Sequence, residues 1–239
     1  MTPIFSLCHS TARLPNGWRA AHDAWRDNAD NWGACEYILG IDAVDIEAVS
    51  LDPKSITVLE DCKVAVNHGR SCAVDGWNAT GKAATGRFLI TAADDMFPPP
   101  HWDTELLKVI PDLDGEYVIE VRSGTSPADD EWMRCMLHSF MTRPYYERIG
   151  NFFYPEYVGM YADVDFGDMA RRDGVVIDAR HLTFQHRHWI GTNVPNDEIY
   201  QRQNAQANYD LGMSILGTRR IKGFAGGNRA PAAGDKILP

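Results

Sequence analysis

The chain has 239 residues, 44% of them apolar, and a formal net charge of −10. This length and composition suit one large α/β domain with a sizeable core. The acidic charge argues against general nucleic-acid binding, because such binding relies on Lys and Arg to neutralise phosphates.

The first half of the chain alternates expected strands with expected helices. Apolar runs predict strands at 3–9, 35–42, 55–61, 64–69 and 87–95, and periodicity or small residues predict helices at 18–29, 71–85 and 101–110. The alternation indicates an α/β fold with a mainly parallel sheet flanked by helices. Such sheets bind ligands at the carboxyl ends of their strands. Thr11, Asp42 and the Asp94–Asp95 pair follow three such ends, so we expect them to share one edge.

The second half of the chain is less regular. We expect a strand at 117–124, a partly helical stretch at 129–150 with a break before Pro144, an aromatic loop leading to an acidic helix within 151–174, one or two strands at 175–189, and a terminal helix at 196–216. An Asn or Asp should cap that last helix. The tail after Arg220 is rich in Gly, Pro and Ala, and we expect it to be flexible.

The five cysteines are odd in number and scattered, with no CxxC spacing. This pattern suits reduced thiols better than a disulfide framework or a zinc site. The sequence also shows no leader-like segment, and no apolar run approaches the ~20 residues that span a bilayer. We therefore expect a cytoplasmic protein without a transmembrane segment.

The stretch FLITAADDMFPPPHW, residues 88–102, ends an apolar run in two adjacent carboxylates. One interpretation is a polar turn, because Asp commonly satisfies nearby backbone groups at strand ends. The other is a cation site, because an isolated buried carboxylate is costly. Oxygen ligands of this kind suit Mg²⁺ or Mn²⁺ holding a diphosphate. The three prolines would stiffen the exit from this turn.

Two further clusters carry candidate chemistry. Asp163, Asp165 and Asp168 open an expected helix, where they either favour the positive end of the helix dipole or supply a general base. His186 and His188 would face the same side of a strand. They could bind a metal as a pair, or one of them could complete a site built on a carboxylate.

The order of these features resembles the family 2-like glycosyltransferases of the GT-A fold. The resemblance is strongest over residues 67–106, where Asn78 lies in a small-residue helix, Ala93-Asp94-Asp95 takes the place of the family's metal motif, and Pro99, Pro100 and Trp102 match the following P-x-W. It is weaker over 161–174, where Ala162 replaces an expected Glu. The turn at residues 10–13 departs from the family's usual opening.

The resemblance implies a GT-A-like domain over residues 1–220, with a nucleotide-sugar half (1–110), an acceptor half (111–220) and a flexible tail (221–239). The implied activity is metal-dependent transfer of a sugar from a nucleotide diphosphate donor, with UDP the expected nucleotide, to an acceptor hydroxyl with inversion. The metal would be Mn²⁺ or Mg²⁺.

The resemblance also assigns residues to roles. Asp95 would bind the metal together with His186 or His188, and Asp94 would reach the ribose or the metal's waters. The remaining donor contacts would come from Thr11, Arg13, Asp42, Arg70 and Asn78. Asp163 is the preferred general base, and Asp165 is the alternative.

The sequence is also compatible with two other functions. A nucleotidyltransferase would share the α/β architecture and the metal, although the loop at residues 10–17 has a single Gly and a single Arg. A non-catalytic domain of the same fold would bind a nucleotide sugar or a glycan without turning it over. The acceptor could be a glycan, a lipid, a protein or a modified nucleobase.

Overall fold

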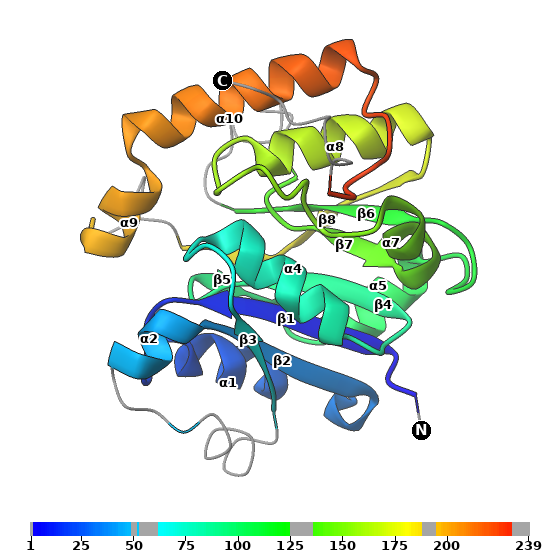
Figure 1. Ribbon diagram of the computed structural model, residues 1–239. Helices are drawn as coiled ribbons and strands as arrows, with labels where there is room; N and C mark the ends of the chain where they lie inside the picture. The colour runs from blue at the N-terminus through cyan, green and yellow to red at the C-terminus, as the bar shows by residue number, and fades with distance from the viewer. Residues whose placement is uncertain (1, 49–51, 53–61, 125–135, 188–194, 231–239) are drawn as a thin grey trace.

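The computed structural model describes residues 2–48, 52, 62–124, 136–187 and 195–230. A seven-stranded sheet runs through the molecule (Figure 1). Its strand order is β3 (Lys63–Asn67), β2 (Cys35–Asp42), β1 (Phe5–Thr11), β4 (Phe88–Ala92), β7 (Phe140–Thr142), β6 (Val118–Arg122) and β8 (Val176–Thr183). The strands from β3 to β4 are parallel, β7 is antiparallel to both of its neighbours, and β6 and β8 are parallel. The expected mixed, mainly parallel sheet is confirmed.

Helices cover both faces of this sheet (Figure 1). One face packs against α1 (Arg19–Asp27) and α5 (Trp102–Val109), and the other packs against α4 (Ala73–Ala83), α7 (Arg143–Ile149), α8 (Ala162–Asp173) and α10 (Gln206–Ile221). Two short helices, α2 (Ala43–Ala48) and α9 (Glu198–Gln203), flank the sheet's carboxyl edge. Side chains alternate between the two faces along β1. Phe5 and Leu7 pack on the face covered by α1 and α5, and Cys8 packs on the face covered by α4.

Tryptophans fix the chain that leaves β4. Trp25 donates a hydrogen bond to the Met96 carbonyl (3.1 Å), and Trp102 donates one to the Trp25 carbonyl (2.9 Å). Both indoles are fully buried, with ring centroids 5.1 Å apart in an edge-to-face arrangement. Asn28 donates to the Pro98 carbonyl (2.9 Å). The proline segment after the acidic pair is thereby attached to α1, which holds the turn in one position.

Several elements differ from the sequence expectation. The run before Pro144 contains β7, and Pro144 lies in the first turn of α7, where its missing N–H is not needed. The expected terminal helix is divided at residues 204–205 into α9 and α10, and Asp197 caps α9 by accepting from the Tyr200 amide (2.9 Å). The strand expected at 55–61 lies outside the described residues.

The packed part of the chain continues beyond residue 220. Phe224 is buried, and the fully buried Asn228 donates to the Phe152 carbonyl (2.8 Å). The tail that we expected from residue 221 thus begins within packed structure; residues 231–239 lie outside the described part. The aromatic residues of the 152–157 loop are buried as core. In the described residues, no helix is long and apolar enough to cross a membrane.

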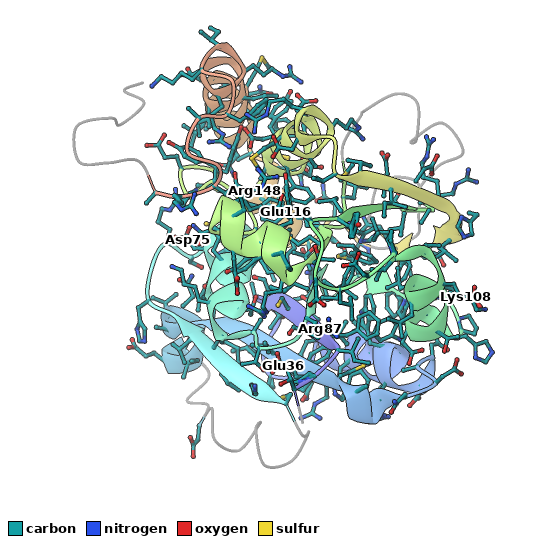
Figure 2. The ribbon with its side chains drawn as sticks, turned by 90° about the vertical axis from the view of Figure 1, so that its right-hand side faces the viewer. Glu36, Asp75, Arg87, Lys108, Glu116 and Arg148 are labelled. Carbon is teal, nitrogen blue, oxygen red and sulfur yellow. The ribbon has the colours of Figure 1, made fainter. Side chains whose placement is uncertain are left out.

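Glu36 lies near the start of β2, at the edge of the sheet opposite to the carboxyl ends of the parallel strands (Figure 2). It accepts hydrogen bonds from the Ser6 hydroxyl (2.5 Å) and the Gly86 amide (2.9 Å), and it pairs with Lys63. Although burial opposes ionisation, bonds from Lys63, Ser6 and Thr85 hold the pKa of Glu36 at about 2. Glu36 thereby joins the starts of β1, β2, β3 and the turn before β4 at the amino edge of the sheet.

Candidate active site

The acidic pair lies on a turn at the carboxyl end of β4. The Met96 amide donates to the Ala93 carbonyl (3.2 Å), so the chain reverses across Asp94 and Asp95. Thr11, at the end of the neighbouring strand β1, donates through its hydroxyl to Asp94 Oδ2 (3.0 Å). The expectation that Thr11 and the acidic pair share one edge is confirmed.

Asp94 is surrounded by side chains that stabilise its charge. His9 Nε2 lies 2.9 Å from Oδ1, and Arg13 donates from a terminal guanidinium nitrogen to Oδ2 (3.4 Å). His9 is fully buried on β1, and its other ring nitrogen contacts the Tyr37 hydroxyl. Both oxygens of Asp94 therefore have donors within the protein. Sequence reasoning did not single out His9, although a histidine inside an apolar strand is a usable signal.

Asp95 lies beside His186. The pairing of β5 (Met96–Phe97) with β9 (Gln185–His186) places Met96 opposite His186, and the Arg187 amide donates to the Asp95 carbonyl (2.7 Å). As a result, His186 Nε2 lies 3.3 Å from Asp95 Oδ2. The structure thus brings together two side chains separated by more than ninety positions in the sequence. The second candidate, His188, lies outside the described residues.

Asp95 and His186 could supply two ligands to a divalent cation. A separation of 3.3 Å between a carboxylate oxygen and an imidazole nitrogen suits two ligands of one ion at about 2.0–2.2 Å from each. Within the described ranges, no group of three or more His, Cys, Asp or Glu side chains could enclose a metal. Such an open donor set fits an ion that takes its other ligands from phosphate oxygens and water, as Mg²⁺ does.

The helix α9 lies across this carboxylate pair. The Tyr200 hydroxyl donates to Asp95 Oδ2 (2.7 Å), and the Arg13 guanidinium lies over the Tyr200 ring at 4.6 Å. Arg13 also pairs with Asp197 (2.9 Å). Burial and the nearby Asp95 carboxylate raise the pKa of Tyr200 well above its usual value, so its hydroxyl stays protonated and donates. Tyr200 and Asp197 were not among the expected site residues.

Asp42 and Arg70, two of the expected donor contacts, are hydrogen-bonded around the loop that follows β3. Asp42, at the end of β2, accepts from the Asn67 amide and the Ser71 hydroxyl, each at 2.6 Å. Arg70 pairs with Asp75 (2.7 Å) and donates to the Tyr157 carbonyl (2.9 Å). These bonds hold the loop that follows β3.

Asn78 is buried on α4. Its amide exchanges two hydrogen bonds with the Phe153 backbone, at 2.9 and 3.1 Å. In this structure Asn78 joins α4 to the aromatic loop.

The two candidate bases on α8 occupy different environments. Asp165 is 1% exposed and forms a two-point ion pair with Arg219 of α10 (2.7 and 3.0 Å), and it also accepts from the Tyr157 hydroxyl (3.1 Å). Asp163 is half-buried in the first turn and accepts from the Val164 amide (2.9 Å). The residue before the helix, Tyr161, has φ of +68°, a conformation that is uncommon outside glycine.

A cavity of about 300 Å³ lies at the far end of α8, lined in part by Arg148, Arg172 and Asp173. The carboxyl-terminal ends of α7 and α8 meet there, and helix ends of this kind attract cations. Arg148 pairs with Asp173 (3.0 Å) and with Glu116 (2.7 Å), beside which it lies in Figure 2. The helix ends and the neighbouring carboxylates therefore account for the presence of arginines at this cavity.

Neither the family models nor the curated proteins contain a match to this sequence. Solved structures do resemble it. A mannosyltransferase from Pyrobaculum calidifontis, solved with GDP-Man and Mn²⁺, aligns over 97% of this chain and 66% of its own, with a TM-score of 0.63 and 14% identity. Glucosyl-3-phosphoglycerate synthase from Mycobacterium tuberculosis, solved with Mn²⁺, UDP and phosphoglyceric acid, aligns over 97% of this chain and 81% of its own (TM-score 0.59, 12% identity). S. aureus TarS aligns over 92% of this chain and 43% of its own (TM-score 0.58, 13% identity).

The chain thus has a GT-A-like glycosyltransferase fold, as its resemblance to the family implied. It spans about two thirds of the mannosyltransferase and less than half of TarS. At 12–14% identity the likeness concerns the arrangement of the backbone.

Proposed function

Because the chain has this fold, we propose that it transfers a sugar from a nucleotide diphosphate donor to an acceptor hydroxyl, with the help of Mn²⁺ or Mg²⁺. The observation that carries the proposal is the 3.3 Å approach of Asp95 and His186 at the carboxyl edge of the sheet. This edge is where open α/β sheets bind ligands. The mannosyltransferase and the synthase of similar fold were solved with Mn²⁺ and with GDP-Man and UDP, respectively.

Asp95 and His186 would hold the cation, with His188 as an alternative to His186. When bound, the cation supplies positive charge to the departing diphosphate. Asp94, with both oxygens engaged by His9, Thr11 and Arg13, would accept a hydrogen bond from a donor hydroxyl such as that of the ribose. Arg13 can also contribute charge near the diphosphate, since its guanidinium has donors beyond those bound to Asp94 and Asp197.

The remaining donor contacts belong to the loops after β2 and β3. Asp42, at the end of β2, would receive the base of the nucleotide, and Arg70 would contact the base or a phosphate. Each of these residues already has partners in the protein, Asn67 and Ser71 for Asp42 and Asp75 for Arg70, so those partners would fix the orientation in which the donor meets them. Asn78 would act indirectly, by holding the aromatic loop through Phe153.

Asp163 is the proposed general base. It would take the proton of the acceptor hydroxyl as that oxygen attacks the anomeric carbon and the bond to the diphosphate breaks. Attack from the side opposite to the leaving group gives inversion. The alternative, Asp165, has both oxygens bound to Arg219 and is 1% exposed, which disfavours contact with an acceptor. The unusual backbone of Tyr161 fixes the start of the helix that carries Asp163.

The test is hydrolysis of a panel of UDP- and GDP-sugars with Mn²⁺, compared between wild type and Asp95→Ala. We expect slow release of nucleotide by wild type that chelator and the substitution both abolish. Asp23→Ala, a change to an exposed carboxylate on α1, is the matched control and should leave hydrolysis unchanged. Tight donor binding without turnover, with any acceptor supplied, would instead favour a non-catalytic nucleotide-sugar-binding domain.

A further inference from the structure

His138 is a buried histidine next to the proposed cation site. It precedes β7, is 3% exposed, and packs its ring edge-on against that of His186, with centroids 6.2 Å apart. Phe140 and Phe184 also contact its ring, at 5.8 and 6.4 Å. His138 therefore lies in an apolar layer beneath the side chains of the site.

A hydrogen bond places one ring proton of His138. Its Nε2 lies 2.9 Å from the Phe184 carbonyl oxygen, which can only accept a hydrogen bond. Nε2 must therefore carry a proton and donate it to this carbonyl.

The bond from His138 fixes the backbone that carries His186. Phe184 lies two residues before His186, where β8 ends and the two-residue strand β9 begins. The Phe184 amide donates to the Arg122 carbonyl (2.9 Å), and the His186 amide donates to the Ser123 carbonyl (2.7 Å). The Phe184 carbonyl points to His138 instead. His138 therefore binds the Phe184 carbonyl, while the amides of Phe184 and His186 are bound by the chain at Arg122 and Ser123.

Packing alone does not explain a histidine at this position. Its Nδ1 is buried and has no hydrogen-bond partner among the described residues. An unpaired buried polar atom is unfavourable, and an apolar side chain would fill the same space without it. The donor on Nε2 is what an apolar residue could not supply.

We propose that His138 is a positioning residue for the cation site: its bond to the Phe184 carbonyl and its ring contact hold the His186 imidazole beside Asp95. The inference rests on the proposed function, because it takes His186 to be a cation ligand. Groups that orient a metal-binding imidazole commonly change metal affinity by about 10–100-fold when removed. Because His138 is buried, it would act through His186.

Two substitutions separate the contributions of the ring and the donor. His138→Phe keeps a ring against His186 and removes the donor to Phe184. His138→Gln keeps an amide donor and removes the ring. The measurement is the Kd of Mn²⁺ from the electron paramagnetic resonance signal of free Mn²⁺, with and without UDP or GDP, on protein shown to be folded by circular dichroism.

We expect the Phe variant to bind Mn²⁺ about tenfold or more weakly than wild type and the Gln variant to recover most of that loss. If the Phe variant does not fold, His138→Asn replaces it, because the shorter Asn amide falls short of the Phe184 carbonyl. Mn²⁺ binding within twofold of wild type in a folded Phe or Asn variant would overturn the positioning role. Equal loss in the Phe and Gln variants would overturn the assignment to the donor.

The proposed function has its own control in the same experiment. His186→Ala should weaken Mn²⁺ binding at least as much as His138→Phe. If wild type itself shows no Mn²⁺ binding with either nucleotide, the proposed function fails, and the positioning role fails with it. If wild type and His186→Ala differ as expected while the His138 variants match wild type, only the inference about His138 is refuted.

Discussion

Replacing Arg219 by alanine should destabilise the protein strongly, whereas the same change at its neighbour Arg220 should have little effect. Both arginines extend from α10 to an aspartate of α8. Arg219 is 3% exposed and binds Asp165 at two points, and it also donates to the Gly227 carbonyl and to Asn228, each at 3.0 Å. Arg220 binds Asp168 at the surface, with about half of its side chain exposed.

The expected difference follows from burial. Removing one partner of a buried ion pair leaves an uncompensated charge and costs about 3–5 kcal/mol. Losing an exposed pair costs roughly 0–1 kcal/mol, because water already solvates both groups. For a chain of this size, 3–5 kcal/mol corresponds to a fall in Tm of roughly 6–20 °C. Arg219 also stacks on Tyr154 at 4.0 Å, so the substitution removes packing as well.

The assay is urea unfolding of wild type, Arg219→Ala and Arg220→Ala, followed by circular dichroism. We expect the free energy of unfolding to fall by about 3–5 kcal/mol for Arg219→Ala. For Arg220→Ala we expect a fall of roughly 0–1 kcal/mol. Asp165→Asn should recover part of the loss in the Arg219→Ala background, because it removes the unpaired charge. Equal effects of the two arginine substitutions would refute the argument from burial and would reopen a catalytic role for Asp165.

Three other outcomes are expected. Asp163→Asn should keep donor affinity within about twofold in calorimetry and lower transfer by roughly 10²-fold or more; weaker donor binding instead would move Asp163 into the donor site. Glu36→Gln should flatten the acid limb of stability measured by denaturant unfolding between pH 5 and 2. The folded pKa of Glu36, about 2, lies below its ordinary value of 4.5, so its contribution is present above 4.5 and is lost as the pH falls toward 2. Arg13→Ala should increase amide hydrogen exchange across α9, because Arg13 joins Asp197 to Asp94; unchanged exchange would show that α9 is held by other contacts.

The sequence identified the features that depend on local patterns. β2 coincides with its expected span, and the acidic helix at 162–173 lies within the expected range. The edge shared by Thr11 and Asp94 followed from the rule that parallel strands end together. These predictions rest on apolar periodicity, strand ends and helix caps, which are patterns that a few neighbouring residues show.

Features that depend on distant pairing were missed. β7 has three residues, too few to show a period, and its place between β4 and β6 is set by tertiary contacts. His9 and Tyr200 reach the acidic pair from 85 and 105 residues away along the chain. The sequence left both Asp163 and Asp165 as candidate bases, and the ion pair of Asp165 with Arg219 on another helix separates their environments.

The antiparallel strand β7 makes the two halves of the chain inseparable. Its residues 140–142 pair with Phe88, Leu89 and Ile90 of β4, all three of which are fully buried. A fragment ending near residue 110 would leave that row of backbone groups and apolar side chains as an open sheet edge, which is a template for aggregation. We therefore expect such a fragment to self-associate, and during synthesis this edge of β4 stays unpaired until β7 has been made.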